Sequence, residues 1–131
     1  MIGVLLAAIL QASVPMRSLD KGISSQIDVA RQAAVRSDAE WNMLWSQHAG
    51  DRARPAVDFN REMVLAVFLG TRPTAGFSVE IVGAREDSGA LVVSYRESRP
   101  PAGIVTAQVL TSPYHFVAVP KHGDVKWERV S

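Results

Sequence analysis

The sequence predicts a β-rich α+β fold, in the form of an antiparallel sandwich or open barrel with one early amphipathic helix. Short apolar or alternating runs recur from residue 63 onward, and residues that favour turns separate them. One segment, residues 37–50, has helical spacing instead. The chain has 131 residues, of which 47% are hydrophobic, and this is enough for one domain with its own core.

Residues 1–14 carry no charge and consist mostly of Ile, Leu, Val and Ala. The run is shorter than the about 20 apolar residues that cross a bilayer, but it has the length of a secretory signal core, with cleavage after Ala12. We therefore expect a signal peptide at residues 1–14 and a periplasmic or secreted protein. A buried N-terminal strand or helix is the alternative. Residues 15–36 are expected to form a linker and the first short strands, one of them around residues 32–36.

Residues 37–50 predict the helix. Ser37 and Glu40 have the spacing of a capping box, in which the Ser37 hydroxyl accepts from the Glu40 backbone and the Glu40 carboxylate returns to the Ser37 N–H. Trp41 and Trp45 lie at positions i and i+4, so we expect them to pack on the sheet rather than to form an exposed aromatic surface. One face of the helix is formed by Trp41, Leu44, Trp45 and His48, which recur at helical spacing. Gly50 follows them and is expected to end the helix.

Six further strands are predicted at residues 63–69, 77–82, 91–96, 105–110, 116–119 and 125–130. The run at 63–69 is continuously apolar, as in a buried central strand, whereas 77–82 alternates as on a half-buried strand. Gly, Pro, Asp and Ser are frequent in the connections and favour turns. Because no second domain, repeat or low-complexity tract is found, residues 37–131 are expected to form one domain.

Composition excludes several functional classes. The formal net charge is +1 and no run of Lys or Arg occurs, so the sequence gives no electrostatic basis for a nucleic-acid partner. Cysteine is absent, which excludes disulfides, thiol catalysis and thiolate metal sites. The same absence removes the cysteine through which a lipoprotein is anchored, so we expect no stable membrane anchor.

Motifs for catalysis or metal binding are not found either. His48, His115 and His122 are scattered without an HExxH pair, and we expect structural roles for them. Ser112, His115 and Asp124 supply the residue types of a catalytic triad, but a triad is defined by geometry, and no GxSxG elbow presents a serine. We therefore predict a protein that is not an enzyme, with no catalytic residue, no metal and no cofactor.

Proline-stiffened loops between the predicted strands are the best candidates for function. They lie at residues 70–77, 99–101 and 111–114. A stiff loop loses less entropy on binding than a mobile one, which suits recognition from a rigid sheet. The alternative is that the prolines only end strands and protect sheet edges. The partner-binding residues predicted from these loops are Arg72, Pro73, Thr74, Gly76, Arg99, Pro100 and Tyr114.

Several motifs follow one another in a defined order within residues 37–119: Trp41, Leu44, Trp45, Phe59, the apolar run from Met63, R-P-T-A-G-F at 72–77, Arg99-Pro100 and Q-V-L-T-S-P-Y-H at 108–115. This ordered set resembles the PrcB C-terminal domain family. The namesake of that family is a lipoprotein that associates with and stabilises a secreted subtilisin-like protease complex. The resemblance therefore implies an exported, non-catalytic domain with a protein partner, a secreted protease. This chain has A-G-F at residues 75–77 where G-G-Y is common in the family, so a contact through that tyrosine hydroxyl does not carry over.

A second similarity gives an alternative function. Residues 73–77, P-T-A-G-F, are similar to the N-P-T-T-G-Y loop of chagasin-type inhibitors, which are β-sandwiches that block papain-like proteases with three loops. Arg72 replaces the asparagine of that loop. The other two loops match poorly, because 87–89 is only weakly glycine-rich and Arg99-Pro100 lacks a following aromatic residue. The alternative is thus a protease inhibitor that presents the Arg72 to Gly76 loop.

Overall fold

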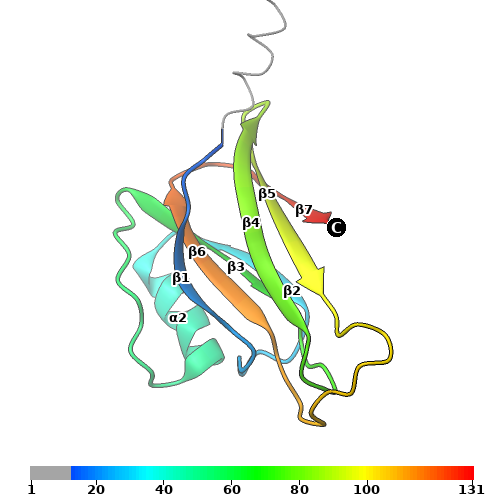
Figure 1. Cartoon of the computed structure of the whole chain (residues 1–131). Coiled ribbons are helices and arrows are strands. Elements are labelled where there is room, and N and C mark those ends of the chain that lie inside the picture. Colours follow the sequence, from blue (N-terminus) through cyan, green and yellow to red (C-terminus); the bar gives the residue numbers. More distant parts are fainter. Residues whose placement is uncertain (1–12) are drawn as a thin grey trace, which may run out of the picture.

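The computed structural model describes residues 13–131 and shows three layers, which are a helix, a four-stranded sheet and a three-stranded sheet (Figure 1). The expected signal peptide at residues 1–14 lies almost wholly outside the described residues. Within residues 13–131, no helix has the length and apolar character needed to cross a membrane. The elements are β1 (Arg17–Gly22), β2 (Arg31–Val35), α2 (Asp38–Ala49), β3 (Glu62–Phe68), β4 (Ser78–Asp87), β5 (Ala90–Ser98), β6 (Tyr114–Pro120) and β7 (Val125–Val130).

The first sheet has the strand order β1-β6-β3-β2 and is antiparallel throughout. The second has the order β4-β5-β7, and its β5–β7 pair is parallel. The β-rich α+β class is therefore confirmed, but the expected purely antiparallel pairing is wrong for β7. The two sheets of the described chain do not close into a barrel. The first sheet takes both of its edge strands, β1 and β2, from the segment expected to be a linker with short strands.

Strands β3 and β6 form the middle of the first sheet and are buried on both faces. Successive side chains of a strand point to opposite faces, so a strand covered on both sides must be apolar at every position. This explains the continuous apolar run of β3. Its alternate residues pack on the α2 side (Val64, Ala66 and Phe68) and on the side of the second sheet (Met63, Leu65 and Val67).

Helix α2 begins and ends as predicted. The Ser37 hydroxyl accepts from the Glu40 N–H at 3.2 Å, and Gly50 follows the last turn with φ +60°. One detail of the capping box differs, because the Glu40 carboxylate accepts from the Arg36 N–H at 3.1 Å and from the Ser37 hydroxyl at 3.2 Å, rather than from the Ser37 N–H. The Trp41 and Trp45 rings lie 5.4 and 5.6 Å from the Phe116 ring of β6, so both belong to the core as expected.

The predicted strand at residues 105–110 is wrong, since these residues form part of a long connection between β5 and β6. Both edges of β6, the next strand in the chain, are already occupied by β1 and β3, so the segment cannot form a hairpin with it. Its pairing is confined to the neighbouring loop, where Ala75 donates to the Ala107 carbonyl at 3.0 Å. Strands β4 and β5 are longer than predicted and meet in a tight turn at Ser88 and Gly89, both with positive φ.

We predict that Leu44→Ala lowers the free energy of unfolding by about 2–5 kcal/mol, because Leu44 is buried between α2 and the first sheet. The adjacent substitution Met43→Ala is the matched control. Met43 is exposed, so its loss is expected to change stability by no more than about 0.5 kcal/mol. Urea unfolding followed by tryptophan fluorescence measures both values. Equal losses for the two variants would contradict the packing of α2 on the first sheet.

Candidate protein-interaction surface

Three connections meet where β1 and β3 end and β6 begins, at the lower end of Figure 1. They are residues 23–30, 69–77 and 99–113, and we call them the loop end. Backbone hydrogen bonds join them: Ser112 donates to the Ile23 carbonyl at 2.7 Å, while Arg72 and Thr111 exchange bonds of 2.7 and 2.9 Å. The loops far apart in sequence therefore hold one another in place.

Most of the loop residues predicted to bind a partner lie at the loop end. Pro73 is exposed, and Arg72 is half-buried with its guanidinium 5.8 Å from the Phe77 ring centre. Thr74 is half-buried, and its carbonyl accepts from the Thr111 hydroxyl at 3.0 Å. Hydrogen bonds from the 99–113 loop therefore hold the backbone of the 69–77 loop in position.

Gly76 and Pro100 form the closest contact between these two loops. Gly76 has φ +97°, and a Cβ atom there would lie 2.7 Å from the Pro100 Cγ. Arg99, next to Pro100, is exposed. The structure therefore brings together the 70–77 and 99–101 segments that the sequence singled out separately.

Tyr114 does not lie on this surface. Its side chain is 3% exposed, and its ring centre is 4.2 Å from that of His48 beneath α2. The reason is its position at the start of β6, the central strand, where even-numbered side chains face the helix. The prediction of Tyr114 as a partner-binding residue is corrected accordingly.

The main exposed feature of the loop end was missed from the sequence. Residues 13–131 contain seven large exposed hydrophobic side chains, and all but Met43 lie at the loop end. Val105 is 96% exposed and Leu110 is 77% exposed. A signal was present, because the adjacent apolar pairs 104–105 and 109–110 do not fit a strand with one face in water. The six residues are Ile23, Val29, Ile104, Val105, Val109 and Leu110.

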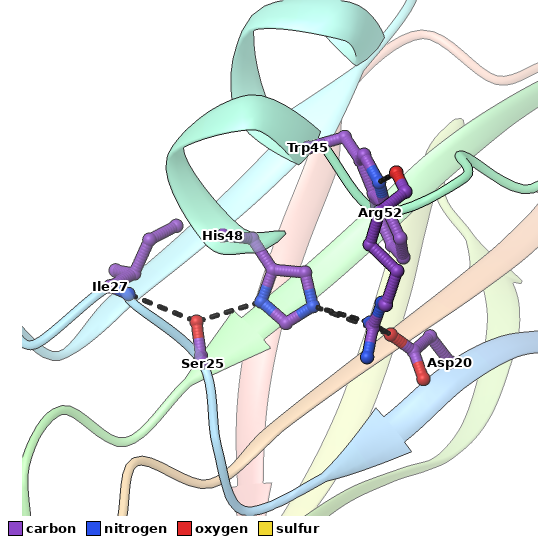
Figure 2. A network of polar contacts seen from close by, with 6 residues as sticks. All are labelled: Asp20, Ser25, Ile27, Trp45, His48 and Arg52. Carbon is purple, nitrogen blue, oxygen red and sulfur yellow. Dashed lines mark hydrogen bonds and ion pairs between the residues drawn. The ribbon is translucent and has the colours of Figure 1, made fainter. Parts of the chain in front are cut away.

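Two networks of polar side chains each contain a histidine bonded to a serine, as in a catalytic triad. Figure 2 shows the first, in which His48 lies between Ser25 (Nδ1 to Oγ, 2.8 Å) and Asp20 (Nε2 to Oδ2, 3.3 Å). Arg52 also binds the Asp20 carboxylate. Burial lowers the pKa of His48, against the raising effect of Asp20. The neutral imidazole therefore donates from Nε2 to Asp20 and accepts at Nδ1 from Ser25.

This network joins the end of α2 to the connection between β1 and β2. The Ser25 side chain, 8% exposed, also accepts from the Ile27 N–H at 3.0 Å. A nucleophilic serine needs an exposed oxygen that can approach a substrate carbonyl. Ser25 is buried and stabilises a local backbone turn through its bond to the Ile27 N–H. Ser25, His48 and Asp20 therefore have a structural role, although they are the residue types of a catalytic triad.

The second network centres on His115, which is 4% exposed and faces the second sheet. Its Nδ1 accepts from the Ile81 N–H at 2.9 Å, and a backbone N–H can only donate. The proton of the neutral ring is therefore on Nε2, which donates to the Ser18 hydroxyl at 2.9 Å. Because that nitrogen already carries a proton, it is not available to take one from Ser18 as a general base. Burial is the main cause that lowers the pKa of His115 to about 4.

The other residues considered for chemistry have separate contacts. The Ser112 hydroxyl pairs with that of Thr71 at 3.3 Å, so it is not part of the His115 network. His122 bonds Glu86 at 2.7 Å near the opposite end of the sandwich. Within the described residues, no three His, Asp or Glu side chains gather closely enough to hold a metal ion.

Fold and surface together define a two-sheet α+β domain with an apolar cluster of loops at one end. Residues 63–120 match the family model described as PrcB C-terminal. The match confirms, for this segment, the resemblance seen in the sequence motifs. It runs from β3 to β6 and includes two of the three connections of the loop end. Neither a curated protein nor a solved structure matches the chain.

Substitution of Gly76 by Val is expected to destabilise the domain more than the same substitution at Gly103. Both residues have positive φ, which disfavours a β-branched side chain, but only at Gly76 does the new Cβ meet Pro100. The difference in unfolding free energy should be roughly 1–3 kcal/mol, the usual cost of overpacking. Chemical denaturation of the two variants measures it. Equal stabilities would show that the two loops do not press on each other at Gly76.

Stability is expected to fall as the pH drops from about 6.5 to about 4. The folded-state pKa of His115 lies below its ordinary value of 6.5, so the unfolded chain binds more protons in this window. The contribution lost is at most about 3 kcal/mol, and the lowered pKa of His48 acts in the same direction. Urea unfolding across this range checks the prediction. His115→Asn, which keeps an acceptor for the Ile81 N–H but does not titrate, should reduce the slope; an unchanged slope would contradict the role given to His115.

Proposed function

We propose that this chain is an exported, non-catalytic protein–protein interaction domain that serves as an accessory or stabilising subunit of a secreted protease complex. Its contact surface in this proposal is the loop end. The PrcB C-terminal match over residues 63–120 supports the connection with a protease complex. The exposed apolar side chains at the loop end support protein binding, and they are the observation that carries the proposal.

The argument for a contact surface starts from the cost of exposing apolar groups. Val105 and Leu110 add little packing to the folded domain, yet each keeps apolar area in water. Burying such a side chain in a complex contributes about 1.5–3 kcal/mol. Large apolar side chains gathered on one part of a surface mark interaction sites in folded proteins. The 99–113 connection also reaches the length of about 12–15 residues beyond which unstructured loops are usually functional.

The residues predicted from the sequence form the margin of the proposed surface. Arg99 is exposed beside the apolar 104–110 segment, and Arg72 lies half-buried on the neighbouring loop. Arginine at the margin of an apolar patch is typical of protein interfaces. In this arrangement Ile104, Val105, Val109 and Leu110 form the centre of the contact. The margin consists of Arg72, Pro73, Thr74, Gly76, Arg99 and Pro100.

Protease inhibition through the Arg72 to Gly76 loop remains the second candidate, because this loop lies on the outer end of the sandwich. The backbone of Arg72 and of Ala75 is bonded to the 99–113 loop. An inhibitory loop must enter a narrow active-site cleft, and a loop held along one side by its neighbour is less suited to that. The accessory role is therefore preferred.

The double variant Val105→Ser/Leu110→Ser tests the proposed surface. Affinity-tagged protein from the periplasm or medium is expected to recover a secreted protease, identified by mass spectrometry. The variant should recover at least about tenfold less of it, because two anchors of the contact lose their apolar area. Met43→Ser on α2 is the control and should capture as well as the parent. Thermal melting confirms that all three proteins are folded.

Recovery that is equal for the parent and the double variant would overturn the loop end as the contact surface. The inhibitor alternative has its own assay, in which purified domain is added to papain at micromolar concentration. Loss of papain activity, reversed by Arg72→Ala/Thr74→Ala, would favour inhibition over the accessory role. Unchanged activity removes the inhibitor hypothesis for papain-like enzymes.

A further inference from the structure

A groove of about 440 Å³ is lined by residues of β1, β4 and β6. Strands β1 and β4 are edge strands of the two sheets and lie next to each other in Figure 1. This volume is within the range of about 300–1,000 Å³ that small-molecule sites occupy. The groove shares no lining residue with the loop end. Its apolar lining is Met16, Ile81, Val82 and Val117, and its polar lining is Ser18, Lys21, Glu80 and His115.

Two β-bulges shape this groove. The register of β1 shifts between Ser18 and Asp20, and that of β4 shifts between Ile81 and Gly83. The shift in β1 lets Ser18 and Lys21 both line the groove while Asp20 turns to the His48 side. Bulges re-aim side chains in this way and are frequent next to binding sites.

A chain of hydrogen bonds ends at the groove. The Ile81 N–H donates to His115, and His115 donates to the Ser18 oxygen, each over 2.9 Å. Because the Ser18 oxygen is the acceptor of this second bond, its own O–H is left to donate. The buried imidazole fixes the position of that hydroxyl from behind, so Ser18 presents an oriented donor to the groove.

Lys21 supplies a second donor from the same strand. Its Nζ lies 3.3 Å from the Glu80 carboxylate of β4, and the two side chains are 43% and 50% exposed. An ion pair this exposed contributes little and is readily exchanged. An ammonium has three donors, so Lys21 is able to bind a further carboxylate beside Glu80 or in its place.

We propose that the groove binds a carboxylate attached to a short apolar group, as found at a peptide C-terminus or in a fatty acid. Lys21 and Ser18 hold the carboxylate, and the apolar group lies on Met16, Val82 and Val117. A cationic ligand would find Glu80 but would face the donors of Ser18 and Lys21, so the donor set favours an anion. This site shares no residue with the loop end and does not depend on the proposed protease-complex role.

An NMR titration of the ¹⁵N-labelled full chain tests the proposal with two carboxylates. N-acetyl-leucine represents a peptide C-terminus, and octanoate represents a fatty acid. The compound that binds with the lower dissociation constant shows which of these two classes the groove prefers. Shifts are expected at residues 16–21, 80–82 and 115–117 from at least one of them. N-acetyl-leucine amide, which lacks the charge, is the matched control and should give no saturable shifts. Absence of shifts with both carboxylates up to the order of 10 mM, or equal binding of the amide, would overturn the proposal.

Three variants separate the carboxylate site from a nonspecific effect of charge. Lys21→Met should weaken binding about threefold to fivefold, as expected for an exposed ion pair. Lys126→Met on β7 removes the same charge outside the groove and should leave binding unchanged. Glu80→Gln removes the internal competitor for Lys21 and should tighten binding. Weaker binding in Glu80→Gln would show that the ligand needs the Glu80 carboxylate, which contradicts an anionic ligand.

Discussion

Burial of the first sheet on both faces is the constraint on which the rest of the structure depends. Strands β3 and β6 lie between α2 and the second sheet, so nearly all of their side chains must be apolar or fully bonded. On the helix side, Phe116 contacts both Trp41 and Trp45. On the other side, Leu65, Val67 and their neighbours pack on β4 and β5. Edges, loops and connections are then arranged around this fixed centre.

The two buried histidines show how that centre tolerates polar groups. A buried imidazole is stable only when each ring nitrogen has a partner of the right kind. His115 meets one donor and one acceptor, Ile81 and Ser18, while His48 meets Ser25 and Asp20. These partners also fix the tautomers, and in His115 the fixed tautomer opposes base catalysis. The same bonds that stabilise the fold thus explain why histidines near serines need not form a catalytic site.

The two proposals use different consequences of this architecture. The loop end exists because three connections leave the sheets at one end and bond one another, so that six large apolar side chains remain outside the core. The groove exists because the sandwich leaves two bulged edge strands facing each other. One surface suits a protein partner and the other a small anion. Since the two surfaces have no residue in common, each can be tested with its own variants.

The sequence alone determined the features that depend on neighbours within a few residues. These include the Ser37 cap, the stripe of Trp41 and Trp45, the apolar run of β3 and the motifs of the family match. Strand partnership was decided only by the tertiary structure, because a periodic run cannot reveal whether a free edge lies beside it. The 105–110 segment consequently remains a loop, β7 pairs in parallel with β5, and Tyr114 lies under the helix. The loop end and the groove share this origin, because each is formed by residues that are distant in the chain and become neighbours only when the sheets pack.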